Sequence, residues 1–350
     1  MIGNGIVGTA VAATFKKYLS CQNTVTIIDD KRPNQTSLAG QGYLWSIHRC
    51  HNPEELQLSN EAKDAWKALL EDVQYHHHDD DPLDFQPLLH ESGSLLIAPQ
   101  EFSSELKEYQ KVANLLLNNE LEYIPDVSMI NKFVSKGICG LYYPRDLICN
   151  PSALVEALMN TYDIQVEHRT VQDLNQERQN FDVLICCAGP WINHLCNVEV
   201  VPIRGILLHT SPEEPIASAT TPMVPMMEWG YGSQGYHFTL SFRGKNWLIG
   251  ASREDIGFSL TDVDNVSETL LSHALQFVEP KSIGQVDKKT VGFRPALKTN
   301  FINGKRVPYV VEKKNDNLIL CYGFEGQGVL FAAHAASVAY KSIESISNRH

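Results

Sequence analysis

The chain opens on a glycine pattern that restricts its fold more than any other feature. The first ten residues read MIGNGIVGTA, and Gly3, Gly5 and Gly8 follow the spacing G-x-G-x-x-G of a dinucleotide-binding turn. The first glycine permits a tight turn, the second lets the backbone approach a pyrophosphate, and the third lets a helix pack close to a sheet. Apolar residues at helical spacing follow over 9–19, so the pattern predicts a turn that leads into a helix.

An acidic pair supports the same interpretation. Residues 23–30, NTVTIIDD, read as a short buried strand that ends at Asp29 and Asp30. Asp29 lies 26 residues after Gly3, close to the offset of about 20 residues expected for a ribose-binding acid, and Asp30 is the neighbouring alternative. Turn, helix, strand and carboxylate follow in the order of a Rossmann-like domain, although an acidic turn after a strand is also common by itself.

Only Met1 and Ile2 precede the first glycine, whereas the first strand of such a domain lies centrally and usually runs about 5–6 residues. Two explanations fit this truncated first strand. Either a few native N-terminal residues are missing, which we favour, or the protein tolerates a stunted central strand at a cost in cofactor affinity. We expect an intracellular, cytoplasmic protein, and organelle targeting stays open because the chain begins inside a motif.

Composition argues against two classes of protein. The net charge of −12 disfavours a nucleic-acid partner, which needs a basic face. No stretch approaches the roughly 20 consecutive apolar residues of a membrane-spanning helix, so we expect a soluble protein. The eight cysteines contain no CxxC pair, and several lie in apolar runs, which predicts reduced thiols of an intracellular protein.

The run HHHDDD at 76–81 combines histidine and aspartate, two metal-ligand types. Consecutive side chains do not converge on one ion in regular structure, and a metal site needs convergent ligands. We therefore predict an exposed connection there and no catalytic metal.

The rest of the chain alternates helical and strand patterns. A second buried strand, FDVLICCAGP, ends in a glycine turn, and residues 317–343 read as a strand, a glycine-rich turn and an apolar helix. Asn150 followed by Pro151 predicts a helix start. Ser103 or Ser104 is expected to cap an amphipathic helix.

Seven short motifs connect the two ends of the chain. They are GNGIVG, TSLAGQGY, FDVLICCAGPW, VPIRG, WLIGASRED, VGFRP and YGFEGQG. In this order and spacing the chain resembles the D-amino-acid oxidase superfamily of flavoenzymes, which includes glycine oxidase and sarcosine oxidase-like proteins, from Gly3 to about Tyr340. The resemblance implies FAD, not NAD, as the cofactor. Some relatives attach the flavin through a cysteine, but residues 295–318 contain none, so we expect a non-covalent flavin.

The resemblance also implies which residues contact FAD. The first glycine turn binds the diphosphate, the acid after the next strand binds the adenosine ribose, and the following loop lines the flavin. The last glycine-rich turn aims a helix N-terminus at the flavin pyrimidine carbonyl, where a positive dipole end stabilises the reduced anion. The expected cofactor-binding residues are Gly3, Gly5, Ile6, Val7, Gly8, Asp29, Asp30, Ser37, Ala39, Gly40, Gln41, Gly42, Val171, Ala188, Gly189, Trp191, Gly323, Gly326, Gln327, Gly328 and Val329.

Arg294, in the motif VGFRP, is the expected anchor of the substrate. By the resemblance it pairs with the substrate carboxylate, and a planar guanidinium suits that task because it forms two charge-assisted hydrogen bonds with a carboxylate. Tyr236 and Tyr322 are the other expected catalytic residues, each with ordinary packing as the alternative. Trp45 and His48 could line the same pocket.

These patterns predict an α/β fold (α+β overall) with two domains. A discontinuous Rossmann-like FAD-binding domain is expected over 1–82, 143–198 and 290–350. A substrate domain built on an antiparallel sheet is expected over 83–142 and 199–289.

The resemblance implies oxidation of the C–N bond of an amino acid or secondary amine. Hydride passes from the α-carbon to flavin N5, and the resulting imine hydrolyses. The expected partners are a small-molecule substrate and oxygen or another electron acceptor. Two alternatives remain: a relative that oxidises a 2-hydroxy acid through the same arginine, and a non-catalytic relative with weak FAD binding.

Overall fold

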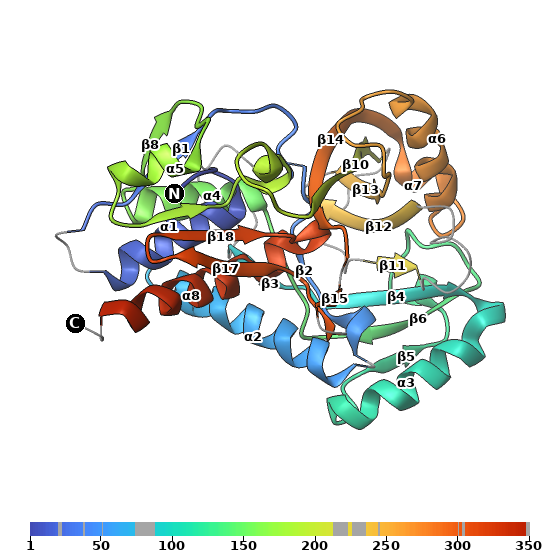
Figure 1. The fold of residues 1–350 in the computed structure, drawn as a ribbon. Helices are drawn as coiled ribbons and strands as arrows, with labels where there is room; N and C mark the ends of the chain where they lie inside the picture. The colour runs from blue at the N-terminus through green and yellow to red at the C-terminus, as the bar shows by residue number, and fades with distance from the viewer. Residues whose placement is uncertain are drawn as a thin grey trace.

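The computed structural model describes residues 1–19, 23–37, 39–50, 52–73, 88–212, 223–225, 236–243, 246–299, 301–302 and 305–347. Within these ranges the chain forms two main sheets with helices packed against them (Figure 1). None of the helices in these ranges is long and apolar enough to cross a membrane. The predicted connection at 76–81 lies outside the described residues.

The first sheet gathers short strands from the two ends and the middle of the chain around a single central residue. Its strands are β1 (Thr26–Asp29), β8 (Gln165–His168), β9 (Leu184–Cys186), β17 (Val310–Asn315) and β18 (Leu318–Tyr322). β1 pairs with β8 and β9 with β18 in parallel, and β17 lies antiparallel to β18. Ile2 forms parallel bridges to Cys186 and to Ile28. The order is therefore β8-β1-Ile2-β9-β18-β17, with the one-residue first strand at the centre, where a Rossmann-like sheet places it.

Backbone hydrogen bonds make this one-residue strand continuous with its neighbours. The amide of Ile2 donates to the carbonyl of Ile185 at 2.9 Å, and the amide of Cys187 donates to the carbonyl of Ile2 at 2.8 Å. On the other side, the amide of Gly3 donates to the carbonyl of Ile28 at 2.9 Å. The Ile2 side chain is 6% exposed, so it also adds to the core.

Small residues let the helices beside this sheet pack closely. They are α1 (Ile6–Tyr18), α2 (Pro53–Leu70), α4 (Pro151–Thr161) and α8 (Gly328–Ser347). α1 and α8 lie side by side (Figure 1), and their buried faces are alanine-rich, with residues 10, 12 and 13 on α1 and 332, 333, 335 and 336 on α8. The predicted start of α4 is confirmed, because the side chain of Asn150 accepts a hydrogen bond from the amide of Ser152.

The second sheet has eight strands in the order β14-β10-β13-β12-β11-β4-β6-β5. They are β4 (Ser94–Pro99), β5 (Glu122–Ile124), β6 (Ile138–Tyr143), β10 (Val200–Ser211), β11 (Met223–Pro225), β12 (Tyr236–Arg243), β13 (Asn246–Ser252) and β14 (Gln285–Leu297). The predicted antiparallel pairing holds except between β11 and β4, which run parallel. The domain boundaries predicted above stay a prediction.

Helices cover this second sheet, and one of them begins differently from the prediction. They are α3 (Ser103–Leu117), α6 (Val263–Ala274) and α7 (Pro280–Ile283). The predicted serine cap of α3 is wrong: Phe102 is the N-cap residue and no side chain caps the helix. A 3-10 turn over Gln100–Phe102 runs straight into α3, so Ser103 is already helical.

The shorter elements complete the chain. They are α5 (Leu174–Glu177), β2 (Tyr43–Leu44), β3 (Leu89–Glu91), β7 (Leu147–Cys149), β15 (Phe301–Ile302) and β16 (Lys305–Arg306). β7 lies between β2 and β3 in a small antiparallel sheet, and β15 pairs with β16.

Candidate active site

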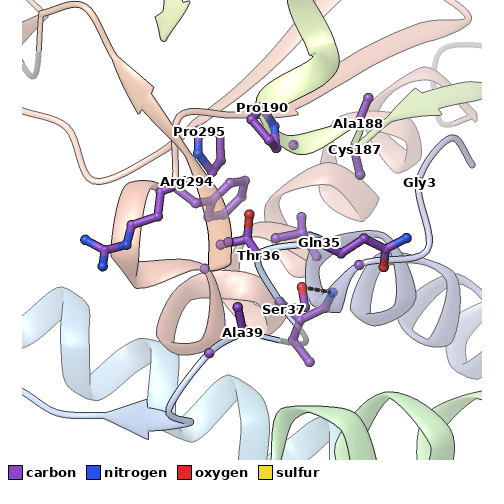
Figure 2. Close-up of a pocket in the computed structure, with 18 of the residues that line it drawn as sticks. Gly3, Gln35, Thr36, Ser37, Ala39, Cys187, Ala188, Pro190, Arg294 and Pro295 are labelled. Carbon is purple, nitrogen blue, oxygen red and sulfur yellow. Dashed lines mark hydrogen bonds between the residues drawn. The ribbon is translucent and has the colours of Figure 1, made fainter. Parts of the chain in front are cut away.

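Both main sheets contribute to one cavity of about 330 Å³, within the range of about 300–1,000 Å³ typical of small-molecule sites. Its walls come mainly from residues within 2–7, 28–45, 187–195 and 292–329. Figure 2 shows Arg294 on one side of this cavity and Gly3 on the other. The cavity is therefore lined by both ends of the chain.

Most of the expected cofactor residues line this cavity. These are Gly3, Gly5, Ile6, Val7, Asp29, Asp30, Ser37, Ala39, Gly40, Gln41, Gly42, Val171, Ala188, Gly189, Trp191, Gly326, Gly328 and Val329. Gly8, Gly323 and Gln327 are not among the lining residues. A Cβ at Gly8 would stand 1.9 Å from the carbonyl oxygen of Gly3, so this glycine lets α1 pack onto the turn.

The glycine turn is held tightly between β9 and α1. Gly3 has a φ of +95°, and a Cβ there would stand 2.5 Å from the carbonyl oxygen of Cys187. Gly5 is the N-cap of α1 and offers no side chain to the helix amides. The hydroxyl of Ser37 accepts a hydrogen bond from the amide of Ile6 at 2.9 Å instead (Figure 2).

The carboxylate of Asp29 fixes the same turn from the end of β1. Its Oδ1 accepts from the amide of Asn4 at 3.1 Å, and its Oδ2 accepts from the amide of Lys31 at 3.0 Å. Asp30 instead forms an ion pair with Arg32, with 2.5 Å between Oδ2 of Asp30 and Nε of Arg32. The guanidinium of Arg32 also lies 5.5 Å from the ring centre of Trp191, so these two lining residues are in contact.

A second arginine lines the cavity beyond the end of β8. Arg169 donates from Nη1 and Nη2 to the two carboxylate oxygens of Glu177, at 2.7 and 2.6 Å. The hydrogen bonds from Arg169 lower the pKa of Glu177. Val171 was expected here from the sequence and Arg169 was not, although a charged residue directly after a strand is a usable signal.

The loop after β1 ties the cavity wall to the second sheet. The hydroxyl of Thr36 donates to the carbonyl of Phe293, and Nε2 of Gln41 lies 3.3 Å from the carbonyl oxygens of Thr239 and Leu248. Thr36, Gln41 and Thr239 all line the cavity. One loop therefore contacts α1, β12, β13 and β14.

Arg294 lies on β14 with its guanidinium between two glycines. A Cβ at Gly205 would stand 2.5 Å from Nη2, and a Cβ at Gly326 would stand 3.7 Å from Cδ. Nη2 donates to the carbonyl of Ser252 at 2.7 Å, which is the one hydrogen bond that Arg294 makes among the described residues. No carboxylate of those residues forms an ion pair with it.

Burial lowers the pKa of Arg294 to about 10, and the nearby carboxylates of Glu325 and Glu254 partly oppose this effect. The guanidinium is therefore positively charged at neutral pH. It is buried and has N–H donors to spare, a setting in which a charge-assisted pair with an anionic ligand is strong.

Two paired glycines make room for this arrangement. Gly205 on β10 and Gly292 on β14 are direct partners in the antiparallel register. Arg294 lies over Gly205, and a Cβ at Gly292 would stand 2.7 Å from the Cβ of Ala39. Both glycines lie in motifs recognised in the sequence, VPIRG and VGFRP, but their pairing is visible only in the structure.

Of the other two expected catalytic residues, only the side chain of Tyr322 is described, and it is not brought to this point. Tyr322 lies outside the cavity, with its hydroxyl donating to Oε2 of Glu312 at 3.0 Å. Neighbouring residues of a strand point to opposite faces of the sheet, and because Cys321 lines the cavity, Tyr322 points to the other face. The side chain of Tyr236 lies outside the described residues, so its role stays a prediction.

Trp45 lines the cavity. His48 does not; its ring packs edge-on against the ring of Trp45, with 5.9 Å between the ring centres. Tyr43, which was missed, lines the cavity beside Trp45 at a ring-centre distance of 4.5 Å. Arg204 does not line the cavity. Its side chain is buried and forms an ion pair with Glu254.

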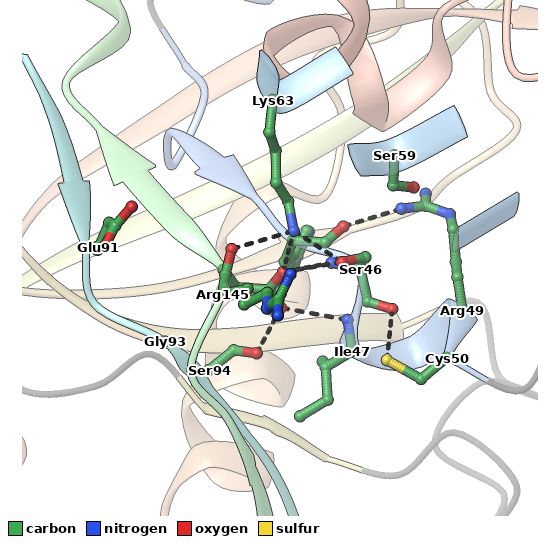
Figure 3. A network of polar contacts seen from close by, with 12 residues as sticks. Ser46, Ile47, Arg49, Cys50, Ser59, Lys63, Glu91, Gly93, Ser94 and Arg145 are labelled. Carbon is green, nitrogen blue, oxygen red and sulfur yellow. Dashed lines mark hydrogen bonds and ion pairs between the residues drawn. The ribbon is translucent and has the colours of Figure 1, made fainter. Parts of the chain in front are cut away.

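A buried ion pair holds the backbone directly after Trp45. Nζ of Lys63 donates to Oδ1 of Asp146 at 2.7 Å, to the hydroxyl of Ser46 at 2.8 Å and to the carbonyl of Arg145 at 3.2 Å (Figure 3). The carboxylate also accepts from the amides of Ser46 and Ile47. The Lys63 and Asp146 side chains are 5% and 1% exposed, and all three ammonium donors are used.

The described part of the chain contains no group of three or more side chains that could hold a metal ion. The described cysteines are free thiols, and Cys187 and Cys321 both line the cavity. Arginines, carboxylates and the N-termini of α1 and α8 also line the cavity.

Comparison with known proteins identifies the sequence family. The model of the family described as FAD dependent oxidoreductase matches residues 1–341. Two curated relatives, both named bifunctional protein ThiO/ThiG, from Trichormus variabilis and Nostoc sp., are 25% identical over 215 residues. The matched part is 57% of this chain and 31% of each relative, so it spans about a third of their length.

Solved structures share the fold along nearly the whole chain. Iminodiacetate oxidase from Chelativorans sp. superposes with a TM-score of 0.79 at 17% identity, covering 98% of this chain and 94% of that one. Glycine oxidase from Bacillus cereus gives 0.75 at 17% identity, with the same coverage. L-α-glycerophosphate oxidase from Mycoplasma pneumoniae with FAD bound gives 0.74 at 15% identity, covering 98% and 93%. The predicted fold class and superfamily resemblance are confirmed.

Proposed function

The chain belongs to the family of FAD-dependent oxidoreductases, and from this premise we propose that it oxidises the C–N bond of an amino acid or secondary amine. The observation that carries the proposal is the unpaired guanidinium of Arg294 at one end of the cavity. A buried cation without a carboxylate partner is costly unless a ligand supplies the anion. A substrate carboxylate meets that need.

The remainder of the cavity fits FAD. The N-termini of α1 and α8 both open onto it, at Ile6 and Gly328, and neither helix carries an acidic residue in its first turn. Such positive ends attract a diphosphate or a carbonyl oxygen. A Cβ at Gly189 would meet no atom within 4 Å, so the wall leaves room for a ligand there.

These features assign parts of the cofactor to residues. The turn at Gly3 and Gly5 and the first amides of α1 would hold the diphosphate. Asp29 would hold the adenosine ribose, since its carboxylate already faces the turn. The N-terminus of α8 would face the flavin.

When bound, FAD supplies the acceptor for the hydride and its two electrons. Arg294 would bind the substrate carboxylate and so fix how the α-carbon is presented, because its own position is restricted by Gly205, Gly326 and Ser252. The aromatic rings of Tyr43 and Trp45 would exclude water from the same region. No acid or base beyond the neutral amine of the substrate is needed to start the reaction.

The test is an anaerobic screen of the FAD-loaded protein. Glycine, N-methylglycine and a panel of D- and L-amino acids are mixed with it beside glycolate and lactate, and loss of flavin absorbance is followed. Bleaching by an amine supports the proposal, and bleaching by hydroxy acids alone contradicts it. A protein that stays colourless after incubation with FAD would instead favour a non-catalytic family member.

A further inference from the structure

Glu325 lies in the last glycine-rich turn, a 3-10 turn over Glu325–Gln327, and it lines the cavity. Its φ of +48° lies in the left-handed region, which glycine adopts more readily than a residue with a side chain. Glycine occupies positions 323 and 326 of the same turn. A glutamate kept in this conformation, at the edge of a ligand cavity, indicates that the carboxylate itself has a task.

The carboxylate of Glu325 is held at one oxygen only. Its Oε1 accepts a hydrogen bond from Nε of Arg253 at 2.7 Å. Among the described residues this is its single hydrogen bond, so Oε2 is available to a ligand. The side chain is 21% exposed, and Arg253 does not line the cavity.

Arg294 lines the cavity beside this turn. The next residue of the turn, Gly326, lies against the Arg294 side chain, and the charge of Glu325 raises the pKa of Arg294 against the effect of burial. Other charges near this end are already paired, Arg204 with Glu254 and Arg253 with Glu325. The cavity therefore presents one unpaired cation beside one half-satisfied carboxylate.

We infer that Glu325 recognises the amine of the substrate, while Arg294 binds its carboxylate. This inference rests on the proposed function and narrows its substrate class to amino acids with one carboxylate and an amine that can bind in its protonated form and react after losing that proton. A hydroxy acid offers Glu325 a neutral O–H donor but no positive charge, so it gains less from this carboxylate. A second carboxylate on the substrate would meet the negative charge of Glu325 and be disfavoured.

The test uses two inert ligands of matched shape on the FAD-loaded protein. N,N,N-trimethylglycine carries a carboxylate and a permanent cation, and 3,3-dimethylbutanoate has the same shape without the cation. Neither has an amine lone pair, so binding is measured free of turnover, from the change in flavin absorbance and by calorimetry. We expect the cationic ligand to bind about fivefold more tightly, as for one partly exposed charge pair.

Two variants give opposite expectations. Glu325→Gln should abolish the preference for the cationic ligand. Arg253→Met removes the competing partner of Glu325 and should increase the preference. If the Arg253–Glu325 pair only stabilised the turn, both variants would lower binding of both ligands in the same direction, and the inference would be overturned.

Arg294→Met separates this inference from the proposed function. Weaker binding of both ligands supports the carboxylate anchor. If both affinities stay unchanged in Arg294→Met, Arg294 does not bind the carboxylate. A preference for the cationic ligand that still depends on Glu325 would then support the role of Glu325 alone. Equal affinities of the two ligands for the unmodified protein would refute it.

Discussion

The hydroxyl of Ser37 caps the first turn of α1 from 31 positions along the chain, through its 2.9 Å hydrogen bond with the amide of Ile6. The first amides of a helix have no partner within the helix, and Gly5 at the N-cap has no side chain to satisfy them. The loop after β1 therefore does what a capping side chain usually does, at the place where the diphosphate is expected.

Ser37→Ala removes this acceptor. We expect the free energy of unfolding to fall by about 1 kcal/mol, the usual effect of losing a cap or a hydrogen bond. Urea denaturation of the FAD-free protein measures it. Ser37→Thr keeps the hydroxyl and is the control, and a Ser37→Ala variant as stable as the unmodified protein would contradict the capping role.

Gly205→Ala should displace the substrate anchor without touching the glycine turn. The new Cβ would stand 2.5 Å from Nη2 of Arg294, so the guanidinium must move. We expect the Kd of a carboxylate ligand such as acetate to rise about tenfold, because orientation of the bidentate pair is lost. Flavin content is the internal control, and an unchanged Kd would show that Arg294 does not bind the carboxylate from this position.

The pKa of Arg294 predicts how binding depends on pH. Burial lowers it to about 10, so the guanidinium is charged below that pH and loses its charge as the pH rises through about 10. The affinity for acetate should therefore be constant from pH 7 to about 9 and fall above it. Arg294→Met should bind weakly at every pH. A decrease already between pH 7 and 8 would point to a different titrating group.

Breaking the buried pair behind Trp45 should destabilise the fold strongly. Lys63→Met leaves the carboxylate of Asp146, which is 1% exposed, without its cation. We expect a loss of about 3–5 kcal/mol in the free energy of unfolding. The double variant Lys63→Met with Asp146→Asn should recover part of this loss. If the double variant is no more stable than Lys63→Met alone, the two charges are not coupled.

The flavin should leave the protein on acid precipitation. Cys187 and Cys321 line the cavity, but a hydrogen bond with Cys321 and burial raise the pKa of Cys187, which keeps its nucleophilic thiolate scarce. All of the yellow colour is expected in the supernatant, and a yellow pellet would show a covalent bond.

Features whose residues lie close together in the sequence could be predicted, whereas features that join distant residues could not. The glycine turn, Asp29 and the motif around Arg294 each lie within a few residues, so pattern and resemblance located them. The Lys63–Asp146 pair spans 83 positions and consists of ordinary residue types, so no local pattern announces it. Cys321 lines the cavity and the next residue, Tyr322, does not, and which of two neighbouring strand residues faces a cavity is decided only in three dimensions.

Glu325 shows a different limit. It stands in the quoted motif YGFEGQG, yet its left-handed backbone and its bond with Arg253 depend on how the turn meets β13 and β14. Resemblance to a family directs attention to the positions that match, whereas Glu325 is informative because it is a charged residue among glycines.

The single-residue strand at Ile2 couples the stability of the first sheet to ligand binding in the cavity. Ile2 joins the β8–β1 pair to the β9–β18 pair, and Gly3, the next residue, begins the ligand-binding turn. A ligand that binds only the intact turn should therefore lower the equilibrium population in which these two halves are separated. Amide exchange at Ile28 and Cys187, whose hydrogen bonds are made to residues 1 and 2, would report this separation.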